Sequence, residues 1–224
     1  MSRIGQSASE TSQSFSVGAA PLVAASVLPQ AIKEFRAHRP DVRVQLFDGG
    51  TATIMPMVES GQLDMGVGVF FKHAPGIRRT PLFRFFLMVI RADNGAASRR
   101  ATITWSALKG ETLISQPPTL PIQQFIDKHL ARAGVVHPPS FVLNYLNTQI
   151  AMVEAGEGVA IIPSYGLPAC RDRRVVMSRL INPVVHLDFY EIRHGGRKLP
   201  PVAKDFISFL QSYIAGWAGR SGVL

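Results

Sequence analysis

Strand-like and helix-like segments alternate along this chain, and that alternation limits the possible folds more than any other feature. Val42, Val44 and Leu46 alternate with polar residues, which is the period of a half-buried strand. Leu28, Ile32 and Phe35 recur at the spacing of one helix face. The same reading predicts strands at 14–19, 42–47, 63–70, 82–91, 113–115, 141–143, 159–162 and 184–193, with helices at 28–35, 51–59, 119–134, 147–156 and 200–214. Such alternation predicts an α/β fold with parallel-rich sheets.

A polar break at 92–101 separates two such runs, which indicates two α/β subdomains. The late strand and last helix need a partner sheet, so the chain is expected to return to the first subdomain. The domains are then subdomain I at 14–92 with 189–216, subdomain II at 93–188, and a flexible leader at 1–13. Crossovers near 92 and 188 would form a hinge, and ligands of such folds bind outside the carboxyl ends of strands. A ligand between the subdomains is expected.

Composition narrows the class of protein. Hydrophobic residues make up 46% of the 224 residues, which excludes a disordered chain. The single Cys excludes an intramolecular disulfide framework. No apolar run approaches the ~18 residues of a membrane span, and the polar start does not resemble a secretory signal. A soluble, cytoplasmic protein is expected.

The chain carries a formal net charge of +9, which is compatible with a nucleic-acid patch or with attraction of anionic ligands. The basic residues, however, fall in small separate groups without interleaved aromatic residues, so a dispersed basic surface is favoured. The groups are Arg78-Arg79, Arg99-Arg100, 171–174 and 193–198.

Motifs for catalysis or cofactor binding are missing from the sequence. Gly156-Glu157-Gly158 has Ile161 where a dinucleotide fingerprint needs its third glycine, and it follows a helix instead of a strand. There is no phosphate-binding P-loop, zinc-binding His-Glu helix or nucleophile elbow. No enzyme activity, cofactor or metal is therefore predicted. Cys170 lies beside several arginines, which would favour a thiolate if the side chain were exposed; an inert surface or half-buried thiol is the favoured alternative.

Hydroxyl and amide side chains stand at the expected helix starts, at Thr51, Thr119, Asn147 and Thr148. Each one is explained by a simple N-cap. At corresponding points of two subdomains, they are also compatible with a site for a small polar ligand, since helix N-termini hold anions. Both readings stay open at this point.

Three segments resemble one known family. They are VGAAPLVAASVLPQAIKEFRAHRPDVRVQLFDGGT, MVESGQLDMGVGV and LNTQIAMVEAGEGVAIIP, in this order. Together they resemble the effector-binding domain of LysR-type transcriptional regulators over about residues 15–214. The resemblance implies a type 2 periplasmic-binding-protein-like fold: two Rossmann-like subdomains joined by two crossover strands. It also implies an N-terminal winged helix-turn-helix in the full-length regulator, which is not within this sequence.

The resemblance assigns effector-binding positions residue by residue. They are Ala20, Pro21, Thr51, Val69, Gln116, Pro117, Asn144 and Tyr145. Many members carry hydroxyls at the positions of Ala20 and Leu22, and these are missing here. Thr51 is then the main polar contact from subdomain I, with Asn144 or Gln116 from subdomain II. This pattern favours an aromatic or partly apolar effector with one polar end over a simple dicarboxylate.

The resemblance predicts a ligand-sensing domain that controls DNA binding through the N-terminal domain. The alternative is a solute-binding protein of a transport system, which has the same fold. A homodimer or tetramer is expected, with the helix near 28–35 of one subunit against that near 122–130 of the other. The opposing interpretation assigns both apolar stripes to the intramolecular core.

Overall fold

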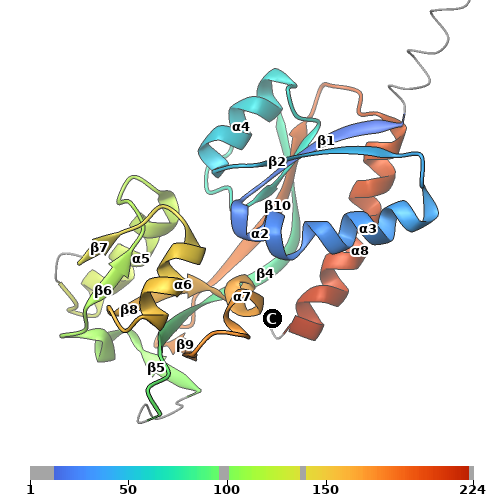
Figure 1. Ribbon diagram of the computed structural model, residues 1–224. Coiled ribbons are helices and arrows are strands. Elements are labelled where there is room, and N and C mark those ends of the chain that lie inside the picture. Colours follow the sequence, from blue (N-terminus) through green and yellow to red (C-terminus); the bar gives the residue numbers. More distant parts are fainter. Residues whose placement is uncertain (1–12, 96–100, 137–139, 222–224) are drawn as a thin grey trace, which may run out of the picture. The chain divides into compact units, whose positions relative to one another are not determined.

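The chain divides into two compact units and passes from one to the other twice (Figure 1). The computed structural model describes residues 13–95, 101–136 and 140–221, so the predicted leader lies outside the described residues except for Gln13. Unit 1 extends to Arg84 and continues from Asp188 to Arg220; unit 2 is Phe85–Leu187. The two passages occur within strands β4 (Ile77–Ala92) and β10 (His186–His194). The subdomain boundaries expected near 92 and 188 stay a prediction.

The sheet of unit 1 is mixed, with three parallel strands at one side. Its first strands are β1 (Ser14–Ala19), β2 (Arg43–Asp48) and β3 (Met65–Gly68). The strand order is β2-β1-β3-β10-β4. Strand β1 is parallel to both of its neighbours, and β10 is antiparallel to β3. The carboxyl ends of β1, β2 and β3 therefore meet at one edge.

Helices cover both faces of this sheet. Successive side chains of a strand point to opposite faces, so the contacts of neighbouring strand residues show which helix lies on which face. The ring of Phe15 packs against Phe35 and Phe206, at centroid distances of 6.4 and 4.7 Å. Gly18 points the other way, where an added Cβ would lie 3.1 Å from Ile54. The helices of unit 1 are α2 (Pro21–Ser26), α3 (Leu28–His38), α4 (Thr51–Ser60) and α8 (Pro201–Ser221). One face of the sheet thus receives α3 and α8, and the other receives α4 (Figure 1).

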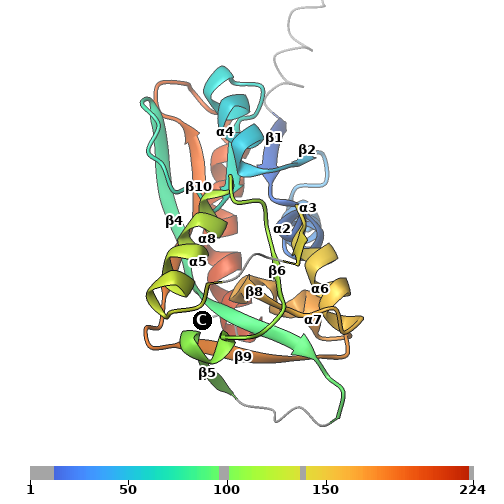
Figure 2. The same cartoon turned by 90° about the vertical axis from the view of Figure 1, so that its left-hand side faces the viewer.

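Unit 2 has a second mixed sheet. The elements of unit 2 are β5 (Thr102–Thr104), β6 (Leu113–Ser115), α5 (Pro121–Arg132), β7 (Phe141–Val142), α6 (Leu146–Glu154), β8 (Val159–Pro163), α7 (Leu167–Cys170) and β9 (Val175–Ile181), with short 3-10 turns at Trp105–Leu108 and Ser164–Gly166. The second half of β4 pairs antiparallel with β8, and the order continues β8-β6-β7 with parallel pairing. Helix α6 lies against β8 (Figure 2).

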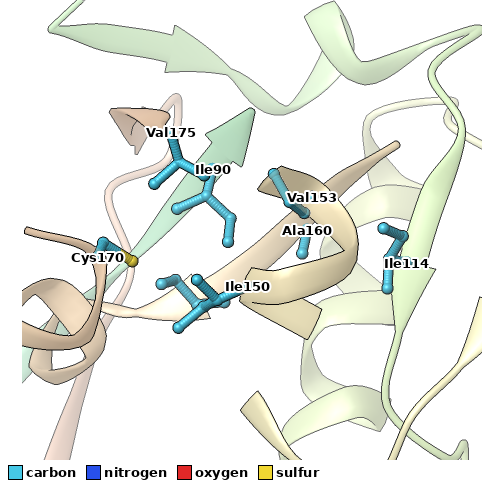
Figure 3. Close-up of a cluster of buried hydrophobic side chains, with 8 residues drawn as sticks. Ile90, Ile114, Ile150, Val153, Ala160, Cys170 and Val175 are labelled. Atoms are coloured by element: carbon cyan, nitrogen blue, oxygen red, sulfur yellow. The ribbon is translucent and has the colours of Figure 1, made fainter. Parts of the chain in front are cut away.

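The core of unit 2 collects residues that are distant in sequence (Figure 3). Ile90 comes from β4, Ile150 and Val153 from α6, and Ile162 from β8; each is at most 1% exposed. Strand β8 is buried at all of its positions, as expected for a strand with both faces covered. The cluster is completed by Ile114, Ala160, Cys170 and Val175.

The sequence analysis missed two strands, β5 and β9, and two short helices, α2 and α7. Strand β9 is a long strand that pairs with β4 and β5, and β5 lies at the end of the polar break. Helix α2 starts at Pro21, because proline is suited to a first helical position. Among the described residues, no helix has the length and apolar content needed to span a bilayer.

The predicted N-caps are wrong. Helix α4 has Gly50 as its N-cap, α5 has Leu120 and α6 has Tyr145, and none of the three caps forms a side-chain hydrogen bond. The helices begin at positions set by the chain geometry: Pro121 fixes the start of α5, and α6 begins directly after an extended residue. Thr51 is therefore the first helical residue and not a cap.

A buried carboxyl group in unit 1 leads to a pH prediction. Glu191 on β10 is 0% exposed, and Arg193 Nη1 lies 3.4 Å from its Oε2. Burial raises the pKa of Glu191, while Arg193 and a hydrogen bond from Thr80 oppose that shift. Because the folded protein retains this proton to higher pH than the unfolded chain, its contribution to stability is greatest at low pH and decreases as pH rises through the raised pKa.

Glu191→Gln is expected to flatten this part of the pH dependence. The free energy of unfolding of the variant minus that of wild type should increase as pH rises from about 4 to about 8, because only wild type loses stability over this range. Urea unfolding at several pH values measures this difference, with the exposed Glu157→Gln as control. A relative stability that declines over the same range would contradict the assignment.

Candidate functional site

The carboxyl ends of the parallel strands in unit 1 bring one group of predicted residues together. Ala20 and Pro21 follow β1, Thr51 starts the helix after β2, and Val69 follows β3. The strand ends are level, since Ala19 is paired with Asp48 of β2 and with Val67 of β3. All four predicted residues are half-buried. The four positions that the family resemblance assigned in unit 1 therefore lie at one edge of its sheet.

Thr51 supplies the one hydroxyl among these four residues. An added Cβ on Gly68 would lie 2.9 Å from Thr51 Cγ2, so the threonine side chain stands directly over the end of β3. Thr51 also begins α4, and the first N–H groups of a helix have no partner within the helix. The hydroxyl and these N–H groups are suited to one polar end of a ligand, next to the apolar Ala20, Pro21 and Val69.

The corresponding edge of unit 2 holds the second group of predicted residues. Gln116 and Pro117 follow β6, while Asn144 and Tyr145 lie between β7 and α6. The two strand ends are tied together: Gln116 Nε2 donates to the Asn144 carbonyl oxygen at 3.3 Å. Leu143 N donates to the Ser115 carbonyl oxygen at 2.8 Å. Asn144 and Tyr145 are exposed, whereas Gln116 and Pro117 are half-buried.

Two buried glutamines of unit 2 were missed by the sequence analysis. Gln123 is 4% exposed; its Oε1 accepts from Gln116 N at 2.9 Å, and its Nε2 donates to Asp127 at 2.7 Å. It positions the Gln116 backbone. The sequence could have indicated Gln123, because it lies three residues before Ile126 and so shares the buried face of α5. A polar residue on such a face needs a partner.

Gln149 is the second of these, in the first turns of α6. Its side chain is 1% exposed, and its Oε1 has no hydrogen-bond partner in the part of the chain that the structure describes. Helix α6 directly follows β7, so Gln149 belongs to the same end of the unit as Gln116 and Asn144. An unpaired buried acceptor costs about 1–3 kcal/mol, which is the kind of cost that functional sites carry.

Cys170 does not have the environment of a reactive thiol. It is 1% exposed in the core of unit 2 (Figure 3), and burial raises its pKa to about 11 despite the nearby Arg173. The arginines that follow it in the sequence are themselves exposed. The alternative of an exposed, arginine-activated thiolate is therefore wrong. Across the described ranges, no group of three metal-ligating side chains is found either.

Comparison with known families decides the class of protein. The sequence model of the LysR substrate binding domain matches residues 8–215. The chain belongs to this family.

Curated relatives of the LysR-type domain are transcriptional regulators. The HTH-type transcriptional regulator YfeR of Shigella flexneri is 27% identical over 223 residues, covering 98% of this chain and 70% of the relative. YbhD of Escherichia coli K12 is 26% identical over 184 residues, covering 82% of this chain and 58% of the relative. The chain thus spans between about half and 70% of the length of the curated relatives it matches.

Solved structures share the fold of this LysR-type domain. The effector-binding domain of QuiR in complex with shikimate has a TM-score of 0.78 and 19% identity, covering 89% of this chain and 96% of that one. An OxyR C206 mutant of Corynebacterium glutamicum has a TM-score of 0.81 and 18% identity, covering 98% and 73%. The predicted type 2 periplasmic-binding-protein-like fold is confirmed, with β4 and β10 as its crossover strands.

Proposed function

We propose that this LysR-type domain binds a small organic effector and catalyses no reaction. The match of the family model over residues 8–215 carries the proposal. In the full-length regulator, effector binding would control DNA binding by an N-terminal winged helix-turn-helix, in the cytoplasm. The relatives reported above are regulators, which gives no support to the alternative of a transport protein.

We infer that the effector contacts the carboxyl-end edges of the two units. The residues concerned are Ala20, Pro21, Thr51, Val69, Gln116, Pro117, Asn144 and Tyr145. The expectation that the ligand lies between the subdomains stays a prediction. The edge of unit 1 offers the Thr51 hydroxyl among apolar side chains, which supports an aromatic or partly apolar effector with one hydroxyl or carboxyl end.

A thermal-shift screen tests the proposed function. Small aromatic acids, hydroxy acids and dicarboxylates are added to the purified chain, and the melting temperature is recorded. A ligand at 100 times its dissociation constant stabilises the folded state by about 2.7 kcal/mol, which is readily measured. Each stabilising compound is then incubated with the protein and analysed for turnover. If the protein converts every stabilising compound into a product, the proposed function is wrong and the protein is an enzyme.

Thr51→Val is expected to weaken binding of that effector severalfold, approaching about tenfold. Valine keeps the shape of threonine but removes its hydrogen bond, which contributes about 0.5–1.5 kcal/mol, and 1.4 kcal/mol corresponds to a factor of ten. Calorimetry measures the affinity of Thr51→Val, of Thr51→Ser, which retains the hydroxyl, and of the exposed control Thr53→Val. Unchanged affinity in Thr51→Val would remove Thr51 from the site without affecting the family assignment.

We also propose that the chain forms a homodimer, since regulators that read paired half-sites match them with two-fold symmetry. The predicted apolar stripes are largely intramolecular: Leu28 and Phe35 of α3, and Ile126 and Leu130 of α5, are buried within their own units. The interface would therefore have to use their polar outer faces. Sedimentation should show a concentration-dependent dimer, and a monomer at all concentrations would contradict the proposal.

A further inference from the structure

A groove lined by cations lies in unit 1, in a part of the molecule that the proposed effector site does not use. Its volume is about 490 Å³, within the range of small-molecule sites. Its five cationic side chains are Arg78, Arg193, Arg197, Lys198 and Lys204, and its lining includes no Asp or Glu. They come from the start of β4, the end of β10, the following loop and the first turn of α8 (Figure 1).

The groove and the effector-binding edge are at opposite ends of the sheet. Strand β10 is antiparallel to β3, with Tyr190 paired with Gly68 and Ile192 with Gly66. Going along β10 towards Arg193 therefore leads to the start of β3, away from Val69. A ligand in this groove would occupy a site separate from the one that contains Thr51.

Two of the five cations have structural partners. Arg193 is 3.4 Å from the buried Glu191. Arg197 Nη2 donates to the Ser60 carbonyl oxygen at 3.0 Å, at the end of α4. Its guanidinium also occupies the space above Gly61, where an added Cβ would lie 0.7 Å from Nη1. An arginine is favourable at a helix C-terminus, which is where Arg197 binds. The ion pair with Glu191 and this helix end therefore hold Arg193 and Arg197 in place.

The other three cations, Arg78, Lys198 and Lys204, form no ion pair with any described residue. All three are exposed. Lys204 is adjacent to Asp205, but that carboxylate is paired with Arg39. Cations gathered within about one screening length, ~8 Å at physiological salt, repel one another, and a bound anion relieves that repulsion.

The lining favours phosphate groups over nucleic-acid bases. Guanidinium and ammonium groups bind phosphate through charge-assisted hydrogen bonds. Ser208 and Gln211 add polar side chains, while Leu199 and Ile207 contribute the buried apolar part of the lining. No Phe, Tyr or Trp side chain is part of the lining, and the imidazole of His194 is its one aromatic ring, so the lining lacks the set of aromatic side chains on which successive bases stack. We propose that this groove binds a small anion carrying two or more phosphate groups.

The experiment uses the full chain and inorganic tripolyphosphate as the probe. Calorimetry at fixed ionic strength should give saturable 1:1 binding that weakens as NaCl increases. Adenosine triphosphate is the second arm: equal affinity indicates that phosphates alone are recognised, and tighter binding indicates a nucleotide source. Both results support the proposal. Citrate that binds as tightly as tripolyphosphate, or duplex DNA that binds more tightly, would overturn it.

Arg78→Gln with Lys204→Gln should weaken tripolyphosphate binding by at least about tenfold, the factor that corresponds to the loss of one charge-assisted hydrogen bond. The matched control is Lys33→Gln with Arg36→Gln, two exposed cations of α3 in the same unit, with the same change in net charge. Lys198→Gln, in an exposed loop, is the alternative if the first variant does not fold. Equal weakening in the control pair, or no saturable binding by wild type, would overturn the proposal.

Discussion

Phe206→Ala is expected to destabilise unit 1 by about 3–5 kcal/mol, the cost of removing a large buried aromatic side chain. Phe206 is 0% exposed and connects the sheet to two helices. Its ring centroid lies 4.7 Å from that of Phe15 on β1 and 5.1 Å from that of Phe35 on α3. Alanine leaves a cavity between all three, since none of the surrounding elements can close in without losing its other contacts.

The two tryptophans allow each unit to be followed separately. Trp217 belongs to unit 1 and Trp105 to unit 2, and the sequence contains no others. Urea unfolding in a Trp105→Phe background therefore reports on unit 1 through Trp217 fluorescence. Phe206→Leu, which keeps most of the volume, should cost under about 1.5 kcal/mol. A loss for Phe206→Ala that is no larger than the loss for Phe206→Leu would contradict this account of the core.

Gly158→Ala is expected to destabilise unit 2 by roughly 2–4 kcal/mol, combining backbone strain with a steric clash. Gly158 lies between α6 and β8 with φ at 150°, a conformation that L-residues rarely adopt. An added Cβ would also lie 2.4 Å from the Thr112 carbonyl oxygen. That oxygen accepts the hydrogen bond from Val159 N at 2.8 Å, so the clash would disturb the pairing of β8 with β6.

Gly156→Ala is the matched control in the same turn. Gly156 has φ at 88°, but nothing lies within 4 Å of an added Cβ. Only the left-handed backbone is then unfavourable, at about 1–2 kcal/mol. Urea unfolding in a Trp217→Phe background, which leaves Trp105 in unit 2, compares the variants. Equal losses at the two positions would show that the Thr112 contact contributes nothing.

The sequence by itself determined the alternation of strands and helices and the order of the longer helices and most of the strands. The prediction for 14–19 coincides with β1, and that for 113–115 with β6, because their periodicity reflects burial of faces. Parallel strands end at one edge of a sheet, and Ala20, Thr51 and Val69 share such an edge because β1, β2 and β3 run the same way. The family resemblance added residue positions to that geometry.

Only the tertiary structure decided which residues far apart in sequence become neighbours. Strand β9 has a weak pattern of its own and exists because β4 and β5 pair with it. The helix starts differed because Gly50 and Pro121, and not the nearby hydroxyls, define the first turns. Gln149 acquired its unpaired oxygen through burial against the sheet, which side-chain type alone does not reveal.

The tertiary structure also decided which basic residues become neighbours. Along the sequence, Arg78 and the group at 193–198 are separate, and a dispersed surface was predicted. Folding places β4 beside β10 and brings the start of α8 to the end of β10, so these groups line one groove. Charge proximity depends on strand pairing across more than a hundred residues, whereas local periodicity reports only on which face of its own element a side chain occupies.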